Sequence, residues 1–193
     1  EEDAPAPEPA AKEVLTGDNS RPAWQPVTTD IPAPKDIVMP GAMTVRVDTQ
    51  GYKQGILTVQ QTMPVTSASM AKNGEMVILF PNWLPGNHAP RGEMDKVSNL
   101  VIIGDNDAII PWRRDPLEVH AIRFTPPKGA KDIGITFDFL SATDGAQGRV
   151  VATPEILNLR WMQLSFYPAG YYARGVAVDA AFNLPDGWQA GTA

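Results

Sequence analysis

The feature that most constrains this chain is a two-residue alternation of apolar and polar side chains, which begins at Met43. It recurs in residues 43–47, 57–63, 133–139 and 176–182. Successive side chains of a β-strand point to opposite faces of the sheet, so each segment predicts a strand with one buried and one wet face. No window from Met43 to Ala193 keeps an apolar face at the helical spacing for three turns. The chain is therefore predicted to be all-β.

Three further runs, at residues 76–80, 100–103 and 164–167, are apolar on both faces. Such runs are typical of central strands that are covered on both sides. Gly-, Asn-, Asp- and Pro-rich turns separate the segments. Short strands with frequent turns predict a β-sandwich, or an open, saddle-like pair of mostly antiparallel sheets.

Residues 1–40 differ in composition from residues 41–193, and we place the domain boundary between the two segments. Eight of the 19 prolines fall in the first 40 residues, which disfavours helices and central strands. We expect a flexible acidic leader that passes into an extended segment pinned by Trp24 and Ile31. A start at Glu1 with Pro/Ala-rich sequence is typical of a mature exported protein, which predicts a periplasmic or secreted location after removal of a signal peptide.

Composition excludes several classes of function. The chain has 193 residues, a net charge of −6 and no cysteine. Disulfides, thiolate zinc sites and a cysteine nucleophile are therefore ruled out. The negative charge disfavours nucleic acid as a partner. No apolar run approaches the length of a membrane span, which is about 20 residues.

Catalytic and metal-binding motifs are missing from the sequence. The only histidines are His88 and His120, the second expected in a strand over residues 117–120. A catalytic zinc ion takes three protein ligands, commonly with a helical His-Glu-x-x-His supplying two, and that motif is absent. Gly-x-Ser-x-Gly is absent as well. We therefore predict no catalytic residue, no metal ligand and no cofactor in this chain.

The segment from Phe80 to Glu93 is the most unusual one. Pro85-Gly86 predicts a type II turn that would hold His88, Arg91 and Glu93 on a stiff loop. One interpretation is structural, with Trp83 packed in the core and Arg91 paired with Glu93 or Asp95. The other is a substrate-contacting edge, in which these three polar side chains bind peptide.

Aromatic residues and arginines are dense in residues 110–116 and 160–174. They could form a sugar- or peptide-binding face, or a sandwich core with guanidinium groups stacked at its rim. We favour core and inter-domain contact. The residues predicted to contact a neighbouring domain are Trp83, Phe166, Tyr167, Tyr171 and Tyr172.

Several of these motifs resemble, in order, the N-terminal domain of the glycyl aminopeptidase family of bacterial gluzincin zinc metallopeptidases. They are Pro81-x-Trp83-x-Pro85-Gly86-Asn87-His88-x-Pro90-x-Gly92, Trp112-Arg113-Arg114-Asp115, Tyr167-Pro168-Ala169-Gly170-Tyr171 and Leu184-Pro185-x-Gly187-Trp188. The resemblance covers roughly residues 38–193, and the Trp-x-Pro-Gly segment is its most specific part.

The resemblance implies an N-terminal β domain, a thermolysin-like zinc domain and often a PDZ-like domain. The implied activity is removal of N-terminal Gly or Ala from peptides. No zinc ligand carries over to this chain, so zinc is expected in the downstream domain. We expect residues 83–93 to face the catalytic cleft, with Glu93 opposite the α-ammonium group of the substrate. The expected partners are the rest of the same precursor and peptide substrate.

Two other classes remain open at this level. The chain could be a free-standing periplasmic β-sandwich that binds peptides or glycans, or a structural protein of the periplasm. A His-Glu-x-x-His motif following residue 193 in the gene would distinguish the aminopeptidase domain from both.

Overall fold

The structure, a computed structural model, describes residues 29–192. Every regular element in this range is a β-strand or one turn of 3-10 helix, which confirms the all-β prediction. No helix in the described range is long and apolar enough to cross a membrane. The prediction for Trp24 lies outside the described residues.

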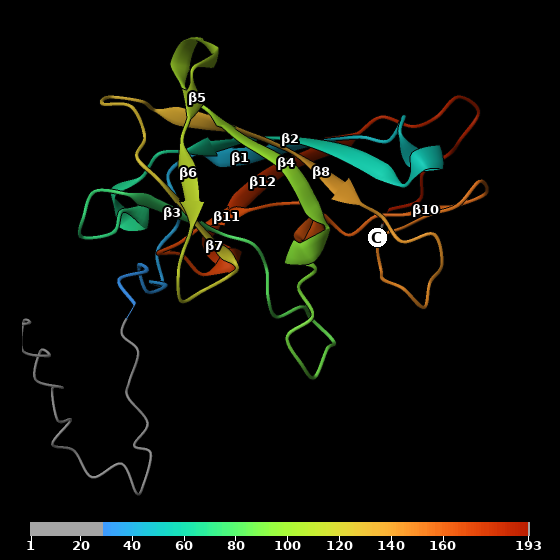
Figure 1. The fold of residues 1–193 in the computed structure, drawn as a ribbon, viewed down its shortest axis with the longest axis horizontal. Coiled ribbons are helices and arrows are strands. Elements are labelled where there is room, and N and C mark those ends of the chain that lie inside the picture. Colours follow the sequence, from blue (N-terminus) through green and yellow to red (C-terminus); the bar gives the residue numbers. More distant parts are fainter. Residues whose placement is uncertain (1–28, 193) are drawn as a thin grey trace, which may run out of the picture.

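Two sheets account for most of the fold (Figure 1). The six-stranded sheet has the order β12-β1-β2-β8-β4-β5 and consists of β1 (Ala42–Asp48), β2 (Ile56–Pro64), β4 (Val97–Ile103), β5 (Ile109–Ile110), β8 (Asp132–Leu140) and β12 (Ala177–Phe182). The four-stranded sheet has the order β11-β3-β7-β6 and consists of β3 (Met76–Leu79), β6 (Trp112–Arg114), β7 (Ala121–Phe124) and β11 (Tyr167–Pro168). A small hairpin adds β9 (Val151–Ala152) and β10 (Leu157–Asn158).

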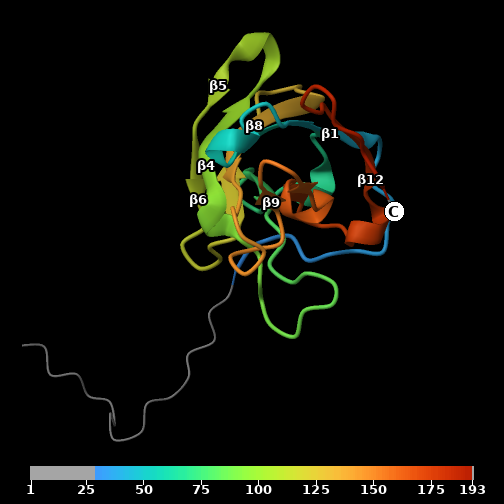
Figure 2. The ribbon, with the colours of Figure 1, turned by 90° about the vertical axis from the view of Figure 1, so that its right-hand side faces the viewer.

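Among the strands of residues 29–192, all pairs are antiparallel except β1 with β12, which are parallel. Viewed along the strands, the large sheet curls from β12 through β1 and β8 to β4 and arches over β9 (Figure 2). This arrangement confirms the prediction of mostly antiparallel, sandwich-like sheets.

The core lies between the inner face of the large sheet and the smaller sheet. Strand β8 shows the expected alternation, with Ile133, Ile135, Phe137 and Phe139 buried. Phe166 joins the two layers, since its ring centroid lies 5.3 Å from those of Phe80 and Phe137, in edge-to-face geometry. Such pairs contribute about 0.5–1.5 kcal/mol beyond the area they bury.

Gln61 is a polar side chain on the inward face of β2, with only 3% of its surface exposed. Its Nε2 donates to the carbonyl oxygen of Phe166 at 2.5 Å, and its Oε1 accepts from the Phe166 amide at 3.0 Å. The side-chain amide thus satisfies both backbone groups of a buried residue that no neighbouring strand pairs.

Three strand predictions need correction. Of the predicted strand over residues 176–182, residues 177–182 form β12, but Val178 is 48% exposed, because β12 is the edge of the sheet. Residues 164–167 contain only the start of the short edge strand β11, because η5 (Trp161–Gln163) precedes them. Residues 117–120 form a turn between β6 and β7 instead of a strand. The backbone amides of Leu117 and Glu118 hold it by donating hydrogen bonds to Oδ1 of Asp115.

Residues 30–35 lie across the smaller sheet as an extended segment, as expected. The Lys35 amide donates to the Gly170 carbonyl, and the Gly170 amide to the Pro32 carbonyl, both at 3.1 Å. Ile31 packs against a small apolar cluster that contains Val77 and Ala121. Ile31, partly buried, thus contributes to holding this segment against the smaller sheet.

A buried arginine adds an ionic link to the same segment. Arg123, 3% exposed, contacts Asp115 through Nε at 2.5 Å and Asp30 through Nη2 at 2.5 Å. Burial alone would raise the pKa of Asp115, but hydrogen bonds from the Leu117 amide and Arg123 outweigh burial and lower it. A hydrogen bond from Arg113 is the main cause of the lowered pKa of Glu75.

Candidate functional site

The loop after β3 is closed at its base and hangs below both sheets in two views (Figures 1 and 2). The Arg91 and Gly92 amides both donate to the Asn82 carbonyl at 2.9 Å. Gly86 has φ +77°, and the Asn87 amide donates to the Leu84 carbonyl at 3.1 Å, which confirms the type II turn. The loop is thus held by its own backbone.

The three predicted substrate-binding residues have different surroundings. His88 and Arg91 are exposed, and neither side chain has a hydrogen-bonded partner among the described residues. Glu93 is mostly covered, with 18% of its side chain exposed. Its pairing partner is Lys96, at 2.7 Å, which corrects the expectation that it pairs with Arg91.

Glu93 belongs to a polar cluster that sequence reasoning missed. Its Oε2 accepts from Nε2 of Gln163 at 2.6 Å, while its Oε1 contacts Nζ of Lys96. Lys96 also donates to the Gln147 carbonyl at 3.1 Å. A Cβ on Gly148 would lie 2.5 Å from Nζ of Lys96, so a larger residue there would force the end of the lysine side chain to shift. The cluster fixes the two loops relative to each other.

An open pocket of about 590 Å³ lies between these loops. Arg91 and Arg149 contribute exposed cations to its lining, and Gln163 contributes a buried amide. Gln163 is 1% exposed, and its Oε1 has no hydrogen-bond partner among the described residues. Almost all buried polar atoms in proteins are paired, so this enclosed oxygen is an exception among the described residues.

The predicted inter-domain residues divide into three groups. Trp83 and Tyr172 are 65% and 42% exposed and lie at the surface. Tyr167 is half-buried, and burial raises its pKa. Phe166 and Tyr171 belong to the core, with 0% and 4% exposed, so the prediction that their side chains contact a neighbour is wrong.

Trp83 also contradicts the structural interpretation of its loop, which placed its indole in the core. Leu84 is buried in its place, at 5% exposed. The predicted stacking of a guanidinium at the rim is confirmed, since Cζ of Arg174 lies 4.4 Å from the ring centroid of Tyr172.

A second hollow, of about 630 Å³, separates Trp83 from the extended N-terminal segment. Leu117, Tyr167 and His120 also line it. Nδ1 of His120 lies 3.3 Å from Oε1 of Glu118. Nε2 of the same ring lies 3.4 Å from the Gly92 carbonyl oxygen, so His120 links the turn before β7 to the loop.

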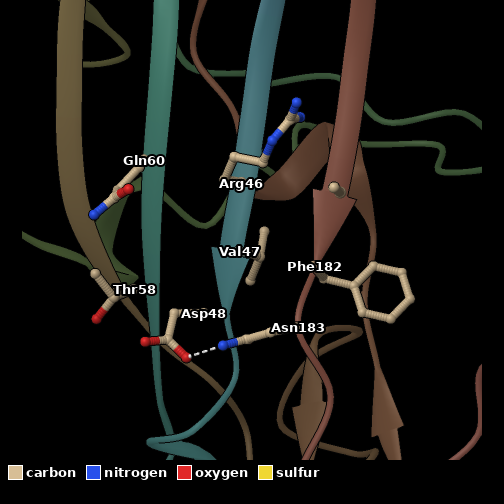
Figure 3. A pocket seen from close by; sticks show the side chains of 8 residues that line it. Arg46, Val47, Asp48, Thr58, Gln60, Phe182 and Asn183 are labelled. Carbon is tan, nitrogen blue, oxygen red and sulfur yellow. Dashed lines mark hydrogen bonds between the residues drawn. The ribbon is translucent and has the colours of Figure 1, made fainter.

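A third hollow lies on the outer face of the large sheet, where β1 meets β12 (Figure 3). Nδ2 of Asn183 donates to Oδ1 of Asp48 at 2.8 Å, and the Gln50 amide donates to the same oxygen at 2.9 Å. The Gln50 bond is the main cause of the lowered pKa of Asp48. The side chains drawn around this hollow point in several directions instead of converging, which is typical of a strand junction (Figure 3).

The donor set does not fit a zinc centre. Among residues 29–192 no three His, Asp or Glu side chains gather closely enough to hold a metal ion. His88 is on the exposed loop, whereas His120 is engaged with Glu118. We therefore derive no zinc-dependent step from residues of this chain.

Together, the fold and the pocket define a β-sandwich domain with a ligand-sized polar cavity. The chain belongs to the Peptidase M61 N-terminal domain family, whose pattern matches residues 44–193. It is thus an N-terminal domain from a family of multidomain peptidases.

A crystal structure of an aminopeptidase N family protein from Idiomarina loihiensis is similar to part of the chain. The identity is 13% and the TM-score 0.42, with 51% of this chain and 15% of that chain covered. The chain thus matches about one seventh of the length of that protein. No curated protein matches the sequence significantly.

Proposed function

We propose that the chain is the non-catalytic N-terminal domain of a zinc-dependent aminopeptidase that removes N-terminal Gly or Ala from peptides. Membership of the Peptidase M61 N-terminal domain family carries this proposal, because it places the chain in a peptidase. The resemblance of the Trp83–Pro85–Gly86 segment to glycyl aminopeptidases supports the finer assignment. Zinc and the general base belong, in this proposal, to a thermolysin-like domain that follows in the same precursor.

The role of this domain is to shape the substrate cleft. The loop of residues 81–93 is held rigidly at its base and carries exposed Trp83, His88 and Arg91. Trp83 and Tyr172 are exposed aromatic side chains, a residue type that is enriched where another domain packs. Rigid loops on a β scaffold are common places for substrate contacts. We also propose a periplasmic or secreted location, where the enzyme would act on peptides.

The test begins with the gene that encodes this chain and its continuation. We expect a His-Glu-x-x-His motif after residue 193, and a purified protein that releases p-nitroaniline from Gly- and Ala-p-nitroanilide. Chelation should abolish the activity, and zinc should restore it. A continuation without a zinc motif, or hydrolysis unchanged by chelation, would overturn the proposal and favour the free-standing peptide- or glycan-binding module.

The loop is tested in the same protein with His88→Ala and Arg91→Ala. If it faces the cleft, at least one substitution raises KM or lowers kcat/KM for short peptides. The matched control is Arg114→Ala, an exposed arginine on β6. Kinetics identical to the control for both loop variants would exclude the cleft-facing arrangement.

A further inference from the structure

An apolar groove of about 570 Å³ lies between the β9–β10 hairpin, η5 and the residues that follow β12. Eight of its 15 lining residues carry large apolar side chains, among them the aromatic rings of Trp161, Phe182 and Trp188. Ile156 and Met162 also line it, and they are 58% and 40% exposed. Contiguous apolar surface is seldom left open on a folded protein, and it marks a site of interaction.

The aromatic walls of the groove are held in place by packing and hydrogen bonding. The ring centroid of Trp188 lies 5.3 Å from that of Tyr52, in edge-to-face geometry. The ring centroid of Trp161 lies 5.7 Å from that of Phe182. The carbonyl oxygen of Trp161 also accepts a hydrogen bond from the Ser165 hydroxyl at 2.9 Å. A partner therefore meets a surface that is already ordered, which lowers the entropic cost of binding.

Charged side chains are scarce in this groove. Among the described residues that line it, Glu155 and Arg160 are the only charged ones. The centres of protein–protein interfaces are likewise poor in Lys, Asp and Glu, and rich in aromatic residues and Met. The lining therefore suits the apolar surface of another protein domain better than a charged small molecule.

One wall of the groove consists of residues 189–192, all of which are exposed. In the proposed function a further domain follows in the same polypeptide, so that domain is tethered directly beside the groove. We propose that the groove is the docking surface for this following domain, which fills it with apolar side chains. Tethering gives the two surfaces a high effective concentration, so that a single groove of this size is enough to bind the domain.

The following domain comes from the proposed function, so the docking assignment deepens that function and rests on it. The contact lies at η5 and the β9–β10 hairpin, apart from the residues, such as Trp83 and Tyr172, that the sequence predicted to contact a neighbour. Gln163 of η5 also donates to Glu93, at the end of the loop after β3, at 2.6 Å. A domain docked on η5 is thereby held at a defined position relative to the loop of residues 81–93.

The experiment uses the whole protein encoded by the gene and takes Met162 as its probe. Met162 is 40% exposed, whereas Met39 and four other methionines are at most 3% exposed. Hydrogen peroxide converts accessible methionines to sulfoxides, and peptide mass spectrometry measures the rate at each position. If the groove is covered, Met162 should be oxidised about tenfold more slowly than the methionine introduced by Ile109→Met, at a β5 position that is 74% exposed. A rate at Met162 close to that of the introduced methionine would overturn the proposal.

A charge placed in the groove tests whether the following domain is what covers it. In the whole protein, Ile156→Glu should raise the oxidation rate of Met162 about fivefold or more, because a buried carboxylate opposes docking. Ile109→Glu, the matched control on β5, should leave that rate unchanged. Slow oxidation of Met39 in both variants shows that the domain stays folded. Continued protection of Met162 in Ile156→Glu would overturn the proposal, and protection that is lost upon dilution would assign the groove to a second copy of the protein instead.

These outcomes are distinct from those that test the proposed function. Aminopeptidase activity in a protein whose Met162 is freely oxidised would sustain the proposed function and remove the docking assignment. Protection of Met162 in a protein without zinc-dependent activity would retain the docking surface and remove the proposed catalytic context.

Discussion

Gln163 donates from Nε2 to Oε2 of Glu93 at 2.6 Å, joining residues 70 positions apart in the sequence. Glu93 lies at the end of the loop after β3, and Gln163 in η5 (Trp161–Gln163). The contact links the loop after β3 to η5, and residues of both line the same pocket. Because the carboxylate can only accept, the contact also fixes the orientation of the Gln163 amide, with its NH₂ group toward Glu93.

Gln61→Leu should destabilise the domain by about 2 kcal/mol or more, although leucine is the more apolar residue. The substitution leaves both the N–H and the C=O of buried Phe166 without a partner, and each unpaired group costs about 1–3 kcal/mol. Urea denaturation measures the change. Gln60→Leu, on the exposed face of β2, is the matched control and should stay within about 0.5 kcal/mol of wild type. Equal stability of the two variants would contradict this account of Gln61.

Phe166→Ala and Trp83→Ala should differ sharply in stability. Phe166 is fully buried between Phe80 and Phe137, so its truncation should cost about 3–5 kcal/mol. Trp83 is 65% exposed, and its truncation should cost less than about 1 kcal/mol. Chemical denaturation of both variants checks the difference. If Trp83→Ala lowers the free energy of unfolding more than Phe166→Ala does, the indole is buried in solution.

The ion pairs that Arg123 on β7 makes with Asp115 and Glu75 should make the stability of the domain depend on pH. The pKa values of Asp115 and Glu75 lie below their ordinary values of 3.8 and 4.5 in the folded state. Their contribution is therefore complete above those ordinary values and is lost as the pH falls through the lower, folded values. Urea unfolding at pH 7, 5 and 3 should show a steep loss only at the acid end.

The matched variants for this effect are Asp115→Asn and Asp186→Asn. Asp115→Asn should be less stable at pH 7, because Arg123 keeps its charge in a buried site, and its stability should fall less between pH 5 and pH 3. Asp186, an exposed residue, should behave as wild type when substituted. If the stability of Asp115→Asn falls between pH 5 and pH 3 as much as that of wild type, other carboxylates cause the loss.

Sequence periodicity predicted the sheets because burial alternates along β1, β2 and β8 as the backbone geometry requires. It was less successful at β12, where an apolar strand lies at an edge and Val178 stays exposed. Alternation reports which residues share a face, but not whether another layer covers that face.

The site was predicted only in part for a related reason. The type II turn at Pro85-Gly86 is a local property and is confirmed. The pairing of Glu93 with Lys96 and Gln163 depends on how distant loops meet, and local sequence does not specify it. A signal did exist, since Gln163 lies between Met162 and Leu164, and Gln61 takes an inward position of the alternation between Val59 and Met63. A polar residue in such a place indicates a buried hydrogen bond that some other part of the chain must complete.

The parallel pairing of β1 with β12 has a consequence for the order in which the domain assembles. Ala42 pairs with Ala177, and Val47 with Phe182. The outer neighbour of β1 in the large sheet is therefore β12, the last strand in the sequence of this domain. On a ribosome, strands β1, β2 and β8 can pair while residues 177–182 are still unmade, and the edge of β1 stays open until they emerge. Closing so long a loop is entropically costly and slow, and open strand edges recruit other chains. Nascent chains should therefore be most prone to aggregate just before β12 is synthesised.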